Sequence, residues 1–171
     1  MKHNPDLLLQ LSLAFAGNPV GWVVVISQGL GADWLKERIS AQNLGNLTVL
    51  DYQPLEVLPD VLAAGDVLVA ILEPEAGIYS VPSKVLSYLC AGRSLLLAMS
   101  PDNLAARTVV EAQAGVVVNP DNLSGFVSAA RNLMERPDLR EFYGKNARRY
   151  AEMHFDIDQI TWQFEEILHK I

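Results

Sequence analysis

The sequence has very few of the residues on which common metal sites and nucleophilic sites depend. Cys90 is the single cysteine among 171 residues, which excludes a disulfide framework and a cysteine-based zinc site. Because Cys90 lies in an apolar run, we expect a buried and unreactive thiol. The histidines, His3, His154 and His169, lie at the two ends of the chain without metal-ligand spacing or a nearby nucleophile. We therefore expect surface histidines, no bound metal and no Ser-His-Asp chemistry.

Basic residues and long apolar runs are also scarce. Lys and Arg number 13 against 20 Asp and Glu, and the formal net charge of −7 argues against a broad nucleic-acid-binding face. No apolar run is long enough to span a bilayer, and no secretory signal opens the chain. We expect a cytoplasmic protein that meets a membrane only through a partner, peripherally at its inner face.

The hydrophobic residues, 50% of the chain, follow two alternating patterns. Runs of valine, isoleucine and leucine predict strands buried on both faces, near 21–26, 47–51, 66–71, 94–98 and 115–118. Amphipathic segments predict helices near 4–16, 31–42, 55–65, 82–91, 100–113, 123–135, 138–153 and 157–170. Strands that alternate with helices pair in parallel through right-handed crossovers. The expected fold is a single α/β domain, a doubly wound Rossmann-like parallel sheet.

Ligands of doubly wound sheets bind at the carboxyl ends of the strands. The loops expected there are 27–33, 51–55, 72–83 and 99–103. A doubly wound unit normally begins with a strand, whereas this chain begins with a helix. We therefore expect a strand upstream of Met1, and exposed apolar surface at the unfilled edge that favours homo-oligomers.

The segment QGLGAD (28–33) contains Gly-x-Gly, but Trp34 stands where the dinucleotide fingerprint has its last glycine, which disfavours a nicotinamide site. Two interpretations remain open. The segment is either a flexible turn before a helix, or a loop in which Gly29 and Gly31 let backbone amides approach a phosphate.

A response-regulator receiver, which is also doubly wound, needs acidic residues clustered at the carboxyl ends of its strands. Here Asp51 ends a predicted strand whereas Asp66 begins one, so the two lie at opposite edges of the sheet. This interpretation is therefore disfavoured.

The segment SVPSKV (80–85) places Pro82, Ser83 and Lys84 at the start of a helix. A lysine there is electrostatically unfavourable, because the helix N-terminus is already positive. A phosphate would bind the free amides, the Ser83 hydroxyl and the Lys84 ammonium together. The alternative, that Lys84 simply extends into water, is equally compatible with these residues. Lys36 lies on a predicted exposed helix face, and its replacement by alanine is not expected to weaken binding of the diphosphate.

The block VPSKVLSYLCAGR (81–93) resembles the donor-binding half of group 1, family 4 glycosyltransferases with the GT-B fold. Within that group it looks closest to the colanic-acid and fucosamine transferase branch. The resemblance extends over nearly the whole chain, including VVVISQGLGADWLKE (23–37) as the family's second strand and glycine turn, and EAQAGVVVNPDN (111–122).

The resemblance implies a nucleoside-diphosphate sugar as donor, with no cofactor and no protein-bound metal. Its diphosphate would lie near Gln28, Gly29 and Gly31, and its base near Tyr52, Gln53 and Pro54. The residues implied to surround the sugar and phosphates are Gly77, Ile78, Tyr79, Ser80, Pro82, Ser83 and Lys84. Lys84 would act in catalysis by stabilising charge on the leaving diphosphate.

The chain departs from the family at the usual pair of glutamates separated by seven residues. Tyr79 and Ser87 occupy the two positions, and neither is acidic. A serine at the second position offers ribose one neutral hydrogen bond, worth about 1 kcal/mol. Donor binding is either reshaped or weakened.

The GT-B fold has two such domains, with the acceptor half first. The resemblance implies that 1–171 is one nucleotide-sugar-binding domain, with a core at about 1–153 and a C-terminal crossover helix at about 154–171. It implies a retaining transferase for cell-surface polysaccharide or glycoconjugate, inactive without an N-terminal acceptor domain or a separate acceptor subunit. The alternative is a non-catalytic nucleotide-sugar-binding or interaction module that complements such a subunit.

Overall fold

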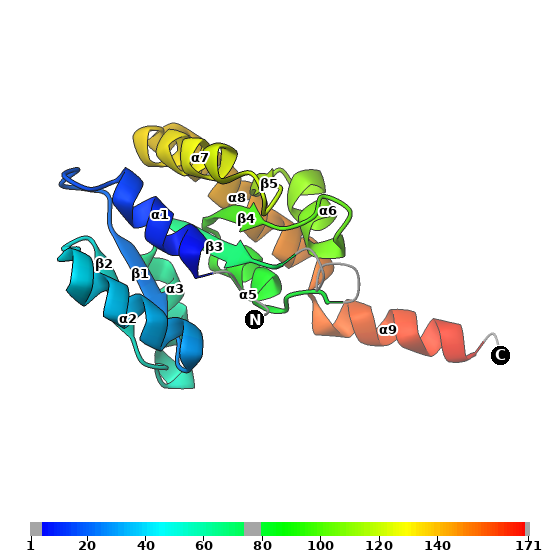
Figure 1. The fold of residues 1–171 in the computed structure, drawn as a ribbon. Helices are drawn as coiled ribbons and strands as arrows, with labels where there is room; N and C mark the ends of the chain where they lie inside the picture. The colour runs from blue at the N-terminus through cyan, green and yellow to red at the C-terminus, as the bar shows by residue number, and fades with distance from the viewer. Residues whose placement is uncertain (1–4, 74–79, 170–171) are drawn as a thin grey trace.

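The structure is a computed structural model that describes residues 5–73 and 80–169 (Figure 1). The strands are β1 (Val23–Ile26), β2 (Leu47–Leu50), β3 (Val67–Ile71), β4 (Ser94–Ala98) and β5 (Gly115–Val118). The helices are α1 (Asp6–Ala14), α2 (Leu30–Gln42), η1 (Leu55–Val57), α3 (Leu58–Ala64), α5 (Lys84–Ala91), α6 (Leu104–Glu111), α7 (Leu123–Glu135), α8 (Pro137–His154) and α9 (Ile157–Leu168). All strand pairs are parallel, so the α/β Rossmann-like prediction is confirmed.

The central strand β4 shows why the core forms where it does. All five of its residues are buried. Leu96 and Ala98 belong to a core cluster with α1 and α7, whereas Leu95 and Leu97 belong to a second cluster with α5, α6 and α8. Since successive strand side chains point to opposite faces, β4 is buried by helices on both sides of the sheet.

The strands form two hydrogen-bonded ladders, β1-β2 and β3-β4-β5, rather than the one continuous sheet that was expected. Among the described residues no ladder joins β1 to β3, although Val23 of β1 and Ile71 of β3 belong to the same core cluster. Val24, in the middle of β1, is 55% exposed. The expected upstream strand and self-association both stay predictions.

Two helix starts differ from the sequence-based expectation. Helix α5 begins at Lys84 rather than Pro82, with Ser83 in the N-cap position. Helix α6 is capped by Asn103 rather than by Ser100 and Pro101, because the Asn103 side chain accepts a hydrogen bond from the Ala105 amide.

The prediction of a buried Cys90 is wrong. Helix α5 buries Val85 and Leu89, which lie four residues apart on one helix face. Cys90 follows Leu89 by one residue, about 100° round the helix, and its side chain is exposed.

The closing helix α9 has no buried residue, and Figure 1 shows it extending away from the two ladders. Its exposed apolar residues include Ile157, Phe164 and Leu168, which share one face of the helix. None of the described helices combines the length and the apolar character needed to cross a membrane. The division into a core and a crossover helix stays a prediction.

Candidate functional site

Three helices begin where parallel strands end. Helix α2 follows β1, α5 follows β3, and α6 follows β4. The first amides of a helix have no partner within it, and the helix dipole adds partial positive charge there. The carboxyl edge of the strands therefore offers several groups that favour an anion.

The glycine turn before α2 has the geometry that its sequence predicted. Gly29 is the N-cap of α2 with φ at 86°, in the region that favours glycine, and no side chain caps the helix there. Gln28 and Gly29 are exposed, and Gly31 lies in the first turn of α2. The turn therefore leaves helix amides accessible to a ligand.

Helix α5 begins directly at the lysine that the sequence analysis selected. Lys84 is its first residue, and the Ser83 side chain caps no helix amide. Although Lys84 is exposed as a whole residue, the protein around its ammonium lowers the Lys84 pKa by desolvation. Within residues 5–73 and 80–169, the ion pairs do not include Lys84. A cation at a positive helix end, without an acidic partner in that part of the chain, is a suitable ligand for an anion.

A residue missed by the sequence analysis fixes the described end of the neighbouring loop. Asn103 is buried, and its Nδ2 donates a 2.8 Å hydrogen bond to the carbonyl of Ser80. Its position before an apolar helix was a visible N-cap signal. The bond to Ser80 was not visible, since the two residues are 23 positions apart. Asn103 therefore ties the Ser80 segment to the start of α6.

The predicted base-contacting loop is open to solvent. Tyr52 is 65% exposed, and Gln53 and Pro54 are exposed as well. Gln53 Nε2 donates to the carbonyl of Asp51 at 2.8 Å, and Lys36 Nζ lies 3.4 Å from Asp51 Oδ1. Lys36 is exposed on its helix, as expected, and lies beside this loop.

The remaining predicted residues are only partly described. Ser87 is exposed on α5, one turn after Ser83 and therefore on the same helix face. Pro82 is half-buried just before the helix. Gly77, Ile78 and Tyr79 lie outside the described residues. No cluster of three or more possible metal ligands occurs in the described part of the chain.

Two cavities among the described residues lie away from this edge. Both are lined by Gly92 and Gly144, near the amino end of β4, and none of the predicted donor residues lines them. The predicted site residues thus form an open surface rather than an enclosed pocket.

No protein-family model matches the chain, and no curated protein matches its sequence. Solved structures do match its fold. Sucrose-phosphate synthase from Thermosynechococcus elongatus superposes with a TM-score of 0.77 and 18% identity, over 95% of this chain and 41% of that one. HepE of Anabaena in complex with UDP-glucose superposes with a TM-score of 0.74 and 19% identity, over 95% of this chain and 45% of the HepE chain.

Two further structures indicate which part of those proteins is matched. TarM of S. aureus in complex with UDP gives a TM-score of 0.78 and 13% identity, over 97% of this chain and 33% of that chain. The C-terminal domain of a group 1 glycosyl transferase from Francisella tularensis gives a TM-score of 0.71 and 14% identity, over 90% of this chain and 79% of that domain. The chain thus spans less than half the length of the first three proteins. Its fold is that of the C-terminal half of GT-B glycosyltransferases.

Proposed function

We propose that this chain is the donor-binding half of a glycosyltransferase that uses a nucleoside-diphosphate sugar. The observation that carries the proposal is Lys84, a cation at the N-terminus of α5 and at the carboxyl edge of the strands, without an acidic partner among the described residues. Structures of similar fold were solved with UDP-glucose or UDP, which supports the same kind of ligand.

In this proposal each described group has a chemical role. The first amides of α5, the Ser83 hydroxyl and the Lys84 ammonium bind the donor diphosphate, and the amides at the Gly29 turn bind it from α2. As the glycosidic bond to the diphosphate breaks, negative charge grows on the leaving oxygen. Lys84 and the α5 dipole stabilise that charge. No metal or cofactor is assigned a role.

The nucleoside lies between the 52–54 loop and α5. The Tyr52 ring is exposed and can stack on a base, while Ser87 faces a ribose hydroxyl from the Ser83 face of α5. A neutral serine at that position gives a weaker contact than a carboxylate, by about 1 kcal/mol or more. We expect nucleotide affinity near millimolar, about 4 kcal/mol of binding free energy.

Transfer also needs an acceptor, which the proposal assigns to an N-terminal domain or a separate subunit. The exposed apolar face of α9 is a suitable surface for contact with it. The complete enzyme would be a retaining transferase of the colanic-acid and fucosamine branch. It would act in the cytoplasm on cell-surface polysaccharide or glycoconjugate, and would reach the membrane only through its partner.

A second function is favoured by one observation. Ser87 is a neutral, exposed residue where the resemblance requires a carboxylate. A nucleotide-sugar-binding module without turnover, which complements an acceptor subunit, would tolerate that change. The two functions differ in one measurement, sugar transfer by the reconstituted pair.

Titration of UDP, GDP and ADP into the chain, followed by calorimetry or NMR, tests the proposal. We expect weak binding of at least one nucleotide, with chemical-shift changes at the amides of Gly29, Ser83 and Lys84, and no sugar transfer by the isolated chain. Lys84→Ala should weaken binding. Arg131→Ala is the control, because Arg131 is an exposed cation on α7 that belongs to none of the predicted donor segments. Absence of binding at several millimolar, or equal losses in both variants, would show that the proposed site is wrong.

A further inference from the structure

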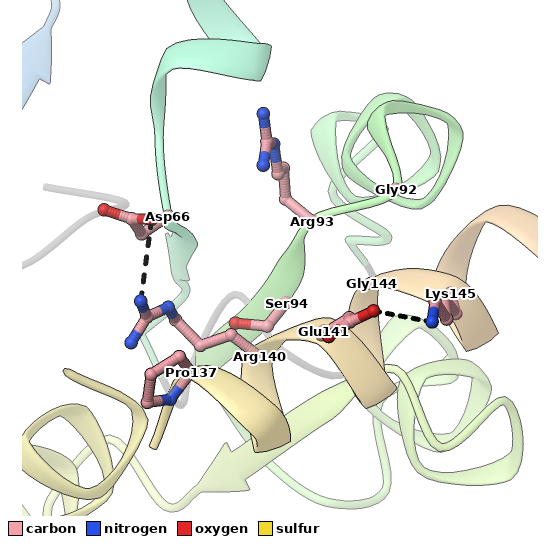
Figure 2. A pocket seen from close by; sticks show the side chains of 9 residues that line it. All are labelled: Asp66, Gly92, Arg93, Ser94, Pro137, Arg140, Glu141, Gly144 and Lys145. Atoms are coloured by element: carbon pink, nitrogen blue, oxygen red, sulfur yellow. Dashed lines mark ion pairs between the residues drawn. The ribbon is translucent and has the colours of Figure 1, made fainter. Parts of the chain in front are cut away.

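A polar pocket lies at the opposite end of the β3-β4-β5 ladder from the proposed donor site (Figure 2). It has a volume of about 290 Å³ and is formed by residues at the amino ends of β3 and β4 and by α8. Ser94, the first residue of β4, lies in this pocket. The strand ends at Ala98, four residues later, so about 13 Å of strand separates the pocket from the carboxyl edge.

A buried hydroxyl without a partner lines the pocket. Ser94 is 1% exposed, and its Oγ forms no hydrogen bond within residues 5–73 and 80–169. Figure 2 shows the Ser94 side chain directed toward the side of the pocket where Arg140 and Pro137 lie. An unsatisfied buried hydroxyl costs about 1–3 kcal/mol, so a ligand that pairs with it gains that amount.

The charged residues around Ser94 carry one more positive than negative charge. Three cations, Arg93, Arg140 and Lys145, line the pocket together with two carboxylates, Asp66 and Glu141. Lys145 Nζ pairs with Glu141 Oε1 at 2.6 Å, so the cation that is less firmly paired with an acid is Arg140. Helix α8 begins at Pro137 beside the same pocket, and the positive end of its dipole adds to the attraction for an anion.

Arg140 is held in place by backbone groups rather than by its acidic neighbour. Its Nη1 donates to the carbonyls of Leu133 and Met134 at 2.7 and 2.8 Å, at the C-terminus of α7. Its Nη2 lies 3.8 Å from Asp66 Oδ1, which is a long ion pair, and the Asp66 side chain is 81% exposed. An incoming anion can therefore replace Asp66 without displacing Arg140.

We propose that this pocket binds a small metabolite that carries a phosphate group. Phosphoryl oxygens accept hydrogen bonds from Ser94 Oγ and from the Arg140 guanidinium. Lys145, on the exposed side of α8, turns from its ion pair with Glu141 toward the bound phosphate. The volume is at the lower limit of about 300–1,000 Å³ for small-molecule sites, which fits a phosphomonoester rather than a nucleotide sugar. The proposal is independent of the donor site.

The test is an NMR titration of the ¹⁵N-labelled chain with inorganic phosphate and with glycerol 3-phosphate, against potassium chloride at equal ionic strength. We expect saturable shifts of the Gly92, Ser94 and Gly144 amides with phosphate and not with chloride. A lower dissociation constant for glycerol 3-phosphate than for inorganic phosphate would identify the ligand as a phosphomonoester. Equal dissociation constants would identify the ligand as the free phosphate ion. Both outcomes support a phosphate site.

Two variants and one control make the test specific. Ser94→Ala should weaken phosphate binding about tenfold, the loss expected at the lower end for one hydrogen bond to a charged group. Lys145→Gln, at an exposed position where folding is unaffected, should weaken it about threefold. Arg131→Ala, at an exposed position on α7 that lines neither site, should leave phosphate binding unchanged. The proposal is overturned if chloride reproduces the chemical-shift changes, or if both pocket variants bind phosphate as tightly as the parent. Either result concerns this pocket alone and has no bearing on the donor site.

Discussion

Substitution of Lys84 by alanine and by arginine distinguishes a lysine that binds a diphosphate from one that extends into water. Lys84 is the first residue of α5, where the helix dipole disfavours a cation, and desolvation lowers its pKa. A bound diphosphate counteracts both effects. A hydrogen bond to a charged group contributes about 1.5–3 kcal/mol, and solvent screening favours the lower end, so Lys84→Ala should lose about tenfold in nucleotide affinity.

The pH dependence of binding has a definite sign. The pKa of Lys84 is lowered in the free protein, and a bound diphosphate raises it because negative charge stabilises the ammonium. Affinity is therefore full below the free-protein pKa of Lys84 and falls as the pH rises through it. Lys84→Arg stays protonated at every accessible pH, so its affinity should change little over the same range.

Calorimetric titration of ADP between about pH 7.5 and 10.5 measures this difference, because neither the protein carboxylates nor the adenine ring change protonation in that range. The comparison needs the parent, Lys84→Ala and Lys84→Arg under identical salt. The reasoning is refuted if Lys84→Ala binds ADP as tightly as the parent. It is also refuted if the parent and Lys84→Arg lose affinity in parallel with rising pH.

Three further substitutions test the local geometry of the proposed site and the core. Gly29→Ala should destabilise the fold by about 1–2 kcal/mol, because φ at Gly29 is positive. Gly45→Ala, where an added Cβ meets no atom, should leave stability unchanged, and equal melting temperatures for the two variants would contradict this reasoning. Asn103→Ala removes the α6 cap and the bond to Ser80, so it should lower both the melting temperature and the nucleotide affinity. Asn122→Ala removes only the α7 cap, so it should lower the melting temperature and leave the nucleotide affinity unchanged. Gly115→Ala should cost several kcal/mol in urea unfolding, because a Cβ there would lie 2.1 Å from the Leu95 carbonyl oxygen; a cost below about 1 kcal/mol would contradict this close packing.

The strands were predictable because each is a short apolar run, although burial on both faces, which was expected of all of them, is complete only in β4. The leucines of β4 illustrate this, since two helical layers cover them. The start of α5 was predictable to within two residues from Pro82 and Lys84. Cys90 was predicted wrongly because the apolar run was taken as a whole, without the helical period that places Leu89 inward and Cys90 outward.

Contacts between distant segments could not be predicted from the sequence alone. The bond from Asn103 to Ser80 depends on where α6 meets the preceding loop. The pairing of Lys36 with Asp51 depends on how α2 lies beside β2. The pocket at Ser94 combines residues from three elements that are separated in the chain. Local patterns determine elements, whereas these contacts follow from the packing of the elements against one another.

The openness of the proposed donor site has a physical consequence for its chemistry. Gln28, Gly29, Tyr52, Lys84 and Ser87 are all exposed, so they can contact a nucleotide on one side only. Small-molecule sites usually bury about 70–90% of their ligand, and a glycosyl transfer needs the acceptor within about 3–3.5 Å of the reacting carbon, with water excluded. A single wall can supply diphosphate recognition but neither condition for transfer. Weak nucleotide binding without turnover is therefore the behaviour that these residues predict for the isolated chain, and a second wall is what would convert binding into catalysis.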